Sequence, residues 1–262
     1  MDFDISACIV LYKNPTEMVS RAIESFLNTR LSVKIYLIDN SPTDDLKVLA
    51  GDDRIEYLHN PSNPGFGSAH NIAIRRVQGK SRYHLVLNPD IYFEEGTLEL
   101  LFSYMEQNQE IGQVMPKVLY PDGNVQYLCK TNPTPFDLFA RRFLPGFLKK
   151  AFKKRMEQYE YRDKNYDQEM RDIPYLSGCF MFIRTDMFGK AGLFDERIFM
   201  YIEDADLTRR MLNVSGTAYY PKATVYHNYA KGSYKSWRLT WYNIHGAFIY
   251  FNKWGWFGKS SK

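Results

Sequence analysis

The chain has 262 residues, enough for one large α/β domain or for one domain with an appendage. Hydrophobic residues make up 45% and charged residues 24%, which is ordinary for a globular protein. The formal net charge of +4 suits an anionic ligand or membrane surface, but it is too small and too dispersed to indicate nucleic-acid binding.

The cysteines and the N-terminal residues indicate where the chain works. Cys8, Cys129 and Cys179 lie far apart and no pair has metal-ligand spacing, so we expect reduced structural thiols. Residues 1–10 lack the basic region and the long apolar core of a signal peptide. No apolar run approaches the roughly 20 residues that span a bilayer. We therefore expect a cytoplasmic location, either in solution or peripheral on the inner face of the cell membrane.

Apolar runs and helical patterns alternate along the first hundred residues. The apolar runs predict strands at residues 5–11, 33–38, 55–58 and 83–87. Helical patterns follow at residues 15–27, 65–77 and 95–105. Strands that alternate with helices predict an α/β fold with a doubly wound, mostly parallel sheet. In such sheets, ligands bind at the carboxyl ends of the strands.

Residues 135–172 differ in character and predict a basic helical insertion. Basic pairs and triplets stand among Phe and Leu at residues 141–142, 149–150 and 153–155. One interpretation is a lid or a patch that faces an anionic, membrane-bound substrate. The alternative is a solvated helix with a mobile loop.

The last hundred residues return to strands and helices. We expect strands at 178–183 and 219–226, and a helix at 207–212. Residues 237–257 are rich in Trp, Tyr and Phe and predict an aromatic C-terminal helix. That helix is either interfacial or packed against the domain. The predicted division is a catalytic domain at 1–230, with its insertion at 135–172, and an amphipathic extension at 231–262.

The most informative run is Leu85–Asp90, where an apolar strand ends in Asn-Pro-Asp. Pro89 has no N–H and stops the strand ladder, so Asp90 is left at the carboxyl end of the strand. A carboxylate there suits a divalent cation, and the cation suits a phosphate. The alternative is a simple turn aspartate.

Two further loops follow predicted strands at the same edge. Asp39 ends the second strand and can accept a hydrogen bond from a ribose hydroxyl or a base; the alternative is an Asx turn. Residues 63–71 contain Gly65 and Gly67, whose backbone lets a ligand approach closely. His70 stands where a dinucleotide fingerprint needs a third glycine or alanine, so a nicotinamide site is not expected.

Acids and one histidine near the C-terminal end complete the candidate site. Glu203, Asp204 and Asp206 stand at a predicted helix start, where they either act as general base or cap the helix. His227 follows a strand and is either a structural histidine or, together with Asp90, a metal ligand.

These motifs, in this order, resemble the family 2 glycosyltransferases of the GT-A fold. The likeness is strongest to bacterial rhamnosyltransferase-like members, which build surface polysaccharides such as O-antigen. It covers about residues 5–230, and the string at 194–207 is its most specific part. The matching residues are 8–12, 39–41, 63–71, 87–90, 177–181 and 194–207.

The resemblance implies an inverting transfer of a sugar from a nucleotide diphosphate to an acceptor hydroxyl. It implies that Asp204 is the catalytic base with Glu203 beside it, and that Asp90 and His227 bind Mg²⁺ or Mn²⁺. Asn88 replaces the first acid of the family's Asp-x-Asp, which weakens the case for a metal. The residues expected to contact the nucleotide sugar are Tyr12, Asp39, Asn40, Gly65, Phe66, Gly67, Asn71, Asn88, Asp90 and Gly178.

The resemblance favours dTDP-L-rhamnose as donor, with UDP-galactofuranose or a UDP-hexose as alternatives. The expected acceptor is a glycan or a polyprenyl-diphosphate-linked oligosaccharide, reached by peripheral contact with the membrane. A nucleotidyltransferase is a weaker alternative, because no early Gly-rich loop with a basic residue follows the first strand. The non-enzymatic alternative is a module that binds a nucleotide sugar or a glycan.

Overall fold

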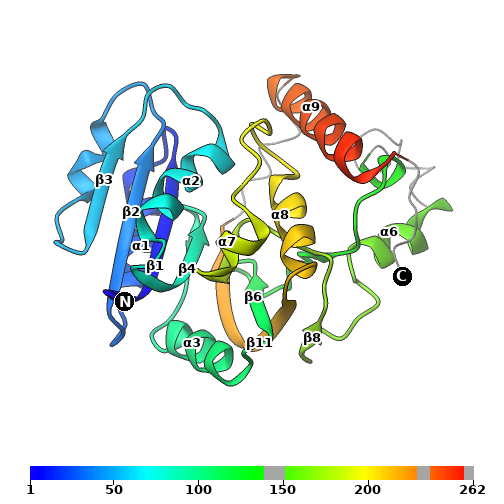
Figure 1. Cartoon of the computed structure of the whole chain (residues 1–262), viewed down its shortest axis with the longest axis horizontal. Coiled ribbons are helices and arrows are strands. Elements are labelled where there is room, and N and C mark those ends of the chain that lie inside the picture. The colour runs from blue at the N-terminus through cyan, green and yellow to red at the C-terminus, as the bar shows by residue number, and fades with distance from the viewer. Residues whose placement is uncertain (139–150, 229–236, 257–262) are drawn as a thin grey trace.

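The computed structural model describes residues 1–138, 151–228 and 237–256 (Figure 1). Helices lie on both faces of a nine-stranded sheet with the order β3-β2-β1-β4-β10-β6-β11-β5, and β8 pairs with β11 at its side. A separate two-stranded sheet joins β7 and β9. The predicted α/β architecture, a doubly wound and mostly parallel sheet, is confirmed.

The first half of the sheet is parallel, and the second half is mixed. The parallel strands on one side are β1 (Phe3–Leu11), β2 (Val33–Asp39), β3 (Ile55–His59) and β4 (Ser81–Leu87). The strands on the other side are β5 (Ile91–Tyr92), β6 (Ile111–Leu119), β8 (Met170–Arg171), β10 (Phe180–Arg184) and β11 (Gly216–His227). The two-stranded sheet consists of β7 (Cys129–Lys130) and β9 (Tyr175–Leu176).

Strand β10 runs antiparallel to both of its neighbours, β4 and β6. Its first residue, Phe180, lies opposite Leu87, the last residue of β4. The chain that enters β10 therefore passes the carboxyl end of β4, where Asp90 follows. β11 runs parallel to β6, and its last residue, His227, pairs with Ile91 of β5.

Two helices cover one face of the sheet and three cover the other. α1 (Thr16–Leu27) and α3 (Thr97–Gln107) share one buried apolar cluster with β1, β4 and β10. The opposite face packs against α2 (Phe66–Val77), α7 (Met187–Ala191) and α8 (Glu203–Leu212). A short 3-10 helix, η1, spans Asp45–Leu49.

The six predicted strands and the predicted helices of the described residues are present, but β5 to β9 were not predicted. β6 was not predicted, because Pro116 and Lys117 interrupt its apolar pattern. The helix predicted from residue 207 begins at Glu203, so all three acids of this segment lie in the first turn of α8.

Part of the predicted insertion lies outside the described residues, including its basic residues at 141–142 and 149–150. Within the described part, α6 (Lys153–Tyr159) carries Arg155, which pairs with the buried Asp137 at 2.8 Å. α9 (Trp237–Trp254) packs against α8 along one side, and it buries Gly246, Tyr250 and Phe251 (Figure 1). Among the described residues, no helix combines the length and the apolar character needed to cross a membrane.

Candidate active site

The parallel strands bring the predicted donor-side residues to one edge of the sheet. Leu11 of β1 lies opposite Asp39 of β2, and Asp39 lies opposite His59 of β3. Lys13 N donates to Ser41 Oγ at 2.8 Å, so the loops that follow β1 and β2 are tied together. Tyr12 is half exposed at this edge.

The Asp39 carboxylate is fully buried and hydrogen-bonded on both oxygens. Ser41 N donates to Oδ1 at 2.9 Å, which forms the Asx turn that the sequence left open. Tyr57 OH donates to Oδ2 at 2.6 Å. Burial raises the pKa of Tyr57, and the hydrogen bond to Asp39 adds to the rise, so the phenol keeps its proton. Asn40 is also buried and accepts a hydrogen bond from Asn60 at 2.8 Å.

Asp90 and His227 meet, as expected for two ligands of one cation. Asp90 Oδ1 and His227 Nε2 lie 3.3 Å apart, and Asn228 N donates to the Asp90 carbonyl at 2.9 Å. Adjacent ligands of Mg²⁺, each at ~2.1 Å from the ion, are separated by about 3 Å, which is close to the observed spacing.

Gln126 sets the tautomer of His227. Its Nε2 donates to the His227 carbonyl at 2.9 Å, and this leaves Oε1 facing Nδ1 of the imidazole, also at 2.9 Å. Nδ1 therefore carries the proton in the neutral ring, and the Nε2 lone pair is directed toward Asp90. Two lone-pair-bearing atoms that face each other suit a cation between them.

The described residues contain no cluster of three or more His, Cys, Asp or Glu side chains suited to a metal ion. A divalent cation at Asp90 and His227 would complete its coordination with substrate phosphates and water, as Mg²⁺ commonly does. Asp90 and His227 therefore fit a divalent cation in two respects. A carboxylate oxygen and an imidazole nitrogen are suitable ligands, and the distance between these two atoms suits one shared ion.

Asp204 is buried and held by three donors. Gly178 N and Tyr175 OH donate to Oδ2 at 2.8 and 3.2 Å, and Ala205 N donates to Oδ1 at 2.9 Å. A carboxylate has about four lone-pair sites, so one is left for another hydrogen bond. The carboxylate is thus oriented before any substrate binds.

Glu203 has a different environment from its neighbour. Its side chain is buried, and its Oε2 has no hydrogen-bond partner among the described residues. Burial raises the pKa of Glu203 well above its usual value, and the nearby Asp204 carboxylate raises it further. The protonated acid, which can donate a hydrogen bond, is favoured.

The segment Gly178–Cys179 joins the two halves of the site. Asn88 N donates to the Cys179 carbonyl at 2.9 Å, and the Gly178 amide binds Asp204. A Cβ on Gly178 would lie 3.0 Å from the Cβ of Asp204, so only glycine allows this approach without a shift. Burial, with smaller contributions from Asp90 and Asp204, raises the pKa of the Cys179 thiol to about 12. The segment thus contacts both the backbone that leads from β4 to Asp90 and the Asp204 side chain.

The glycine-rich loop contacts protein where a ligand was expected. Gly65 has φ +101°, and a Cβ there would lie 2.3 Å from the Phe199 carbonyl. A Cβ on Gly67 would lie 2.8 Å from Cβ of Phe194. The glycines thus bring the start of α2 against residues 194–199, the loop that leads toward Asp204. Phe66 N donates to the Phe199 carbonyl at 2.8 Å.

Asn71 is fully buried and uses its amide within the protein. Its Nδ2 donates to the Phe194 carbonyl at 3.0 Å and to Glu196 Oε1 at 2.9 Å. Its Oδ1 accepts from Phe194 N at 3.0 Å. Asn71 therefore holds the 194–196 loop, and its contact with the nucleotide sugar stays a prediction.

Sequence reasoning missed several residues that contact the predicted ones. Tyr57 contacts Asp39, Gln126 contacts His227, and Tyr175 contacts Asp204. Lys130 is buried, and its Nζ lies 4.5 Å from the ring centre of Tyr175. Among these contacts only the pairing of Asp39 with Tyr57, on neighbouring predicted strands, had a signal in the sequence.

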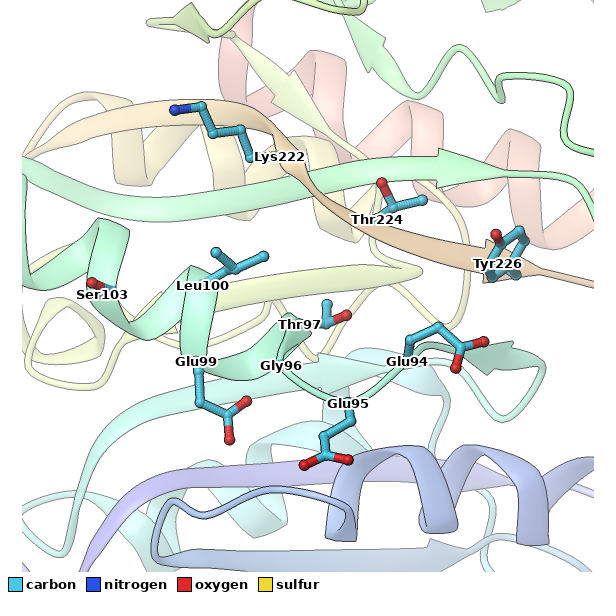
Figure 2. Close-up of a pocket in the computed structure, with 10 residues that line it drawn as sticks. All are labelled: Glu94, Glu95, Gly96, Thr97, Glu99, Leu100, Ser103, Lys222, Thr224 and Tyr226. Atoms are coloured by element: carbon cyan, nitrogen blue, oxygen red, sulfur yellow. The ribbon is translucent and has the colours of Figure 1, made fainter.

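A pocket of about 630 Å³ lies beside this site, between the start of α3 and β11 (Figure 2). Glu94, Glu95 and Glu99 line one side, and Lys222 is the single basic residue among its lining residues. Tyr226 lines the pocket, and alternation along the strand directs its neighbour His227 to the other face. The three carboxylates would repel a diphosphate, so this pocket does not suit that group.

Comparison with known proteins identifies the family of the chain. Residues 6–192 match the profile of Glycosyl transferase family 2, well over half of the 262 residues. The chain belongs to glycosyl transferase family 2. It is therefore a glycosyltransferase, as the resemblance implied, and the nucleotidyltransferase and binding-module alternatives are set aside.

Curated relatives include bacterial rhamnosyltransferases. N-acetylglucosaminyl-diphospho-decaprenol L-rhamnosyltransferase of Mycobacterium tuberculosis is 26% identical over 240 residues, 87% of this chain and 77% of the relative. Rhamnosyltransferase WbbL of Escherichia coli K12 is 30% identical over 155 residues, 56% of this chain and 54% of the relative. The low-salt glycan biosynthesis hexosyltransferase Agl10 of Haloferax volcanii is 24% identical, covering 79% of this chain and 61% of the relative.

Solved structures share the fold. The crystal structure of GalNAc-T7 with UDP, GalNAc and Mn²⁺ superposes with a TM-score of 0.65 at 15% identity, over 87% of this chain. S. aureus TarS 1–349 superposes with a TM-score of 0.57 at 13% identity, over 86% of this chain. This chain spans 43% of the first structure and 60% of the second, and the likeness shows the GT-A fold alone.

The Gly65→Ala variant tests the contact between the glycine-rich loop and residue 199. Gly65 has φ 101° and ψ 173°, a region essentially restricted to glycine, so alanine there costs about 1–3 kcal/mol, and the clash with the Phe199 carbonyl adds about 1–3 kcal/mol. Gly192→Ala is the matched control, because Gly192 has φ 80° and ψ 174° and its added Cβ would meet only the end of the Arg210 side chain, at 3.3 Å. Urea unfolding should show the larger loss for Gly65→Ala. Equal losses would contradict the close packing.

Glu203→Gln tests the raised pKa of Glu203. A raised acid pKa contributes stability below the unfolded pKa of about 4.3, and this stability is lost as pH rises through the folded pKa. Glutamine has no proton to lose, so its free energy of unfolding lacks this pH dependence. The free energy of unfolding of the variant, minus that of the wild type, should therefore increase from pH 5 to pH 8. Denaturant titrations at three pH values measure the difference. Parallel pH profiles would contradict the prediction.

Proposed function

We propose that the enzyme transfers L-rhamnose from dTDP-L-rhamnose, with inversion, to a hydroxyl of a lipid-linked glycan in bacterial surface polysaccharide synthesis. The observation that carries the proposal is that the Gly178–Cys179 segment binds both Asn88, two residues before Asp90, and the Asp204 carboxylate. Support for the sugar and the acceptor comes from the names of the mycobacterial and E. coli relatives.

The donor lies along the carboxyl edge of β1, β2 and β4. Asp39, Asn40 and Tyr12 contact the nucleoside, and the amide of Asn88 lies beside the diphosphate. A divalent cation, Mg²⁺ or Mn²⁺, held by Asp90 and His227, would offset the negative charge of the diphosphate. The sugar lies next to Gly178 and Asp204, which are in direct contact.

Asp204 acts as the general base on the other side of the anomeric carbon. The acceptor hydroxyl gives its proton to the Asp204 carboxylate, and its oxygen forms a bond to the anomeric carbon. The bond from that carbon to the diphosphate oxygen breaks, and the diphosphate leaves with the electron pair. Single displacement inverts the anomeric centre and needs one carboxylate. Glu203, protonated beside the base, is placed to donate a hydrogen bond to the acceptor.

Other nucleotide sugars are alternatives to dTDP-L-rhamnose. UDP-hexoses gain support from the hexosyltransferase relative, and UDP-galactofuranose comes from the resemblance alone. All these donors carry the same diphosphate, so the site residues at the diphosphate do not discriminate among them. Contacts with the nucleobase and with the sugar would.

The enzyme works in the cytoplasm, in peripheral contact with the inner face of the membrane. Support comes from the outer side of α9, where Trp237, Trp241, Ile244 and Phe248 are 47–77% exposed. Their spacing of four, three and four residues puts them on one face of the helix. Trp and Phe on one face of a helix favour the interfacial region of a bilayer.

Asp204→Asn tests the base. The amide cannot take the proton, so transfer should fall on the order of 10²–10⁴-fold, whereas donor binding should survive. Product formation by chromatography and calorimetric titration of the donor measure the two. Asp186→Asn, at an exposed acid directly before α7, serves as the control. Retained activity in Asp204→Asn would remove the base assignment.

A panel of nucleotide sugars tests the donor and the cation. With Mn²⁺ or Mg²⁺ present, dTDP-L-rhamnose at ~100 times its Kd should stabilise the protein by about 2.7 kcal/mol, or a few degrees in melting temperature. EDTA or Asp90→Ala should remove most of that shift. A larger rise in melting temperature with a UDP-sugar would contradict the donor assignment. A rise that EDTA does not change would contradict the role of the cation in donor binding.

Sedimentation with vesicles that contain anionic lipid tests the membrane contact. The wild type should pellet at low salt, and the double variant Trp241→Ser/Phe248→Ser should bind on the order of tenfold more weakly, because less apolar area inserts. Val48→Ser/Val214→Ser changes two exposed apolar residues elsewhere and is the control. Equal binding by both double variants would count against α9 as the contact.

A further inference from the structure

Asp206 belongs to the same acidic segment as Asp204, and the reaction above assigns it no role. It is fully buried. Two residues of an α-helix turn by about 200°, so Asp204 and Asp206 lie on opposite sides of α8. Asp204 faces the Gly178 segment, and Asp206 faces α9.

Three donor side chains from two helices surround the Asp206 carboxylate. Arg210, one turn along α8, donates to Oδ2 at 2.9 Å. Lys253 Nζ lies 2.8 Å from Oδ1, and Trp254 Nε1 donates to Oδ1 at 2.7 Å. A buried charge requires such partners, and two of the three come from α9. Asp206 therefore fastens the end of α9 to the start of α8.

The inner side of α9 covers the loop at residues 198–202. Tyr242 stacks on Phe199 with ring centres 4.1 Å apart. A Cβ on Gly246 would lie 3.0 Å from the Tyr201 carbonyl, so the helix approaches the loop backbone closely. Tyr250 and Phe251 share a buried cluster with Ile198 and Ile202.

The loop that α9 covers is strained just before the catalytic acids. Tyr201 and Ile202 have φ of 72° and 69°, and α8 begins at the next residue, Glu203. Left-handed backbone is disfavoured for non-glycine residues, most of all for a β-branched one such as isoleucine. Such a conformation persists only when its surroundings hold it. The start of α2 holds Phe199, and α9 packs on the loop through Tyr242, Gly246 and Tyr250.

We propose that Asp206 is a positioning residue, which anchors α9 so that α9 holds the loop at residues 198–202 and thereby places the Asp204 carboxylate at the sugar. The inference rests on the proposed role of Asp204 as base. It makes the aromatic C-terminal helix a part of the catalytic apparatus. The donor-side residues Asp39 and Asp90 lie elsewhere in the fold, on β2 and shortly after β4.

Trp254→Phe tests the anchor with the smallest change. It removes the N–H that binds Asp206 and leaves an aromatic ring under the Arg209 guanidinium, which lies 4.2 Å from the Trp254 ring centre. Trp256→Phe is the matched control, because its N–H binds Asn252 of α9 instead of Asp206. Asp206→Asn removes the charge of the anchor and is the more severe change. If that variant does not fold, the comparison of Trp254→Phe with Trp256→Phe still decides the test.

Two readouts separate positioning from general stability. Hydrolysis of dTDP-L-rhamnose should show kcat lowered about tenfold or more in Trp254→Phe, with KM and the calorimetric donor Kd within about twofold, because small misplacements at a reacting centre are costly. Hydrogen–deuterium exchange should rise at residues 198–206 and be unchanged at β1 and β2. Trp256→Phe should match the wild type in both.

Unchanged exchange at residues 198–206, or a kcat equal to the wild type, would overturn the proposal. So would a loss of donor affinity that parallels the loss of kcat, because that is the mark of a general structural defect. Failure of the proposed function has a different signature. In that case Asp204→Asn stays active, whereas the exchange measurement still reports whether Asp206 anchors the loop.

Discussion

The hydrogen bond from the Gly178 amide to the Asp204 carboxylate is the contact on which the site depends. It joins the segment before β10 to the first turn of α8, and the same segment accepts a hydrogen bond from Asn88. Because β10 runs antiparallel to β4, its entry lies at the carboxyl end of that strand, where Asp90 stands. Without this reversal, the acids near residues 90 and 204 would lie at opposite edges of the sheet.

Three acids in one helical turn have three different environments. Asp204 is satisfied by neutral donors and keeps one lone-pair site, whereas Glu203 is buried beside it and favours its protonated form. Asp206 is neutralised by Arg210 and Lys253 on the other side of the helix. The helix N-terminus favours negative charge at all three positions, so the differences arise from the neighbouring elements.

The strands and helices of the first hundred residues could be predicted, because apolar runs and helical periodicity are local properties of the chain. The placement of Asp39 and Asp90 at one edge followed from parallel strands.

β6 could not be predicted, since Pro116 breaks its pattern and its partners lie far along the chain. The same limit applies to Tyr175, Gln126 and α9, whose contacts with Asp204, His227 and Asp206 join distant residues. Gly65 and Gly67 were noticed correctly, but local sequence cannot tell close approach to a ligand from close approach to Phe199 and Phe194.

The place of β10 between β4 and β6 has a consequence for the growing polypeptide. While the ribosome makes residues 88–179, β4 can pair only with β1, and one of its edges stays open. β6 has neither of its neighbours until β10 and β11 have been made. The middle of the sheet therefore closes only late in translation, and two apolar strands must be kept from pairing with other nascent chains until then.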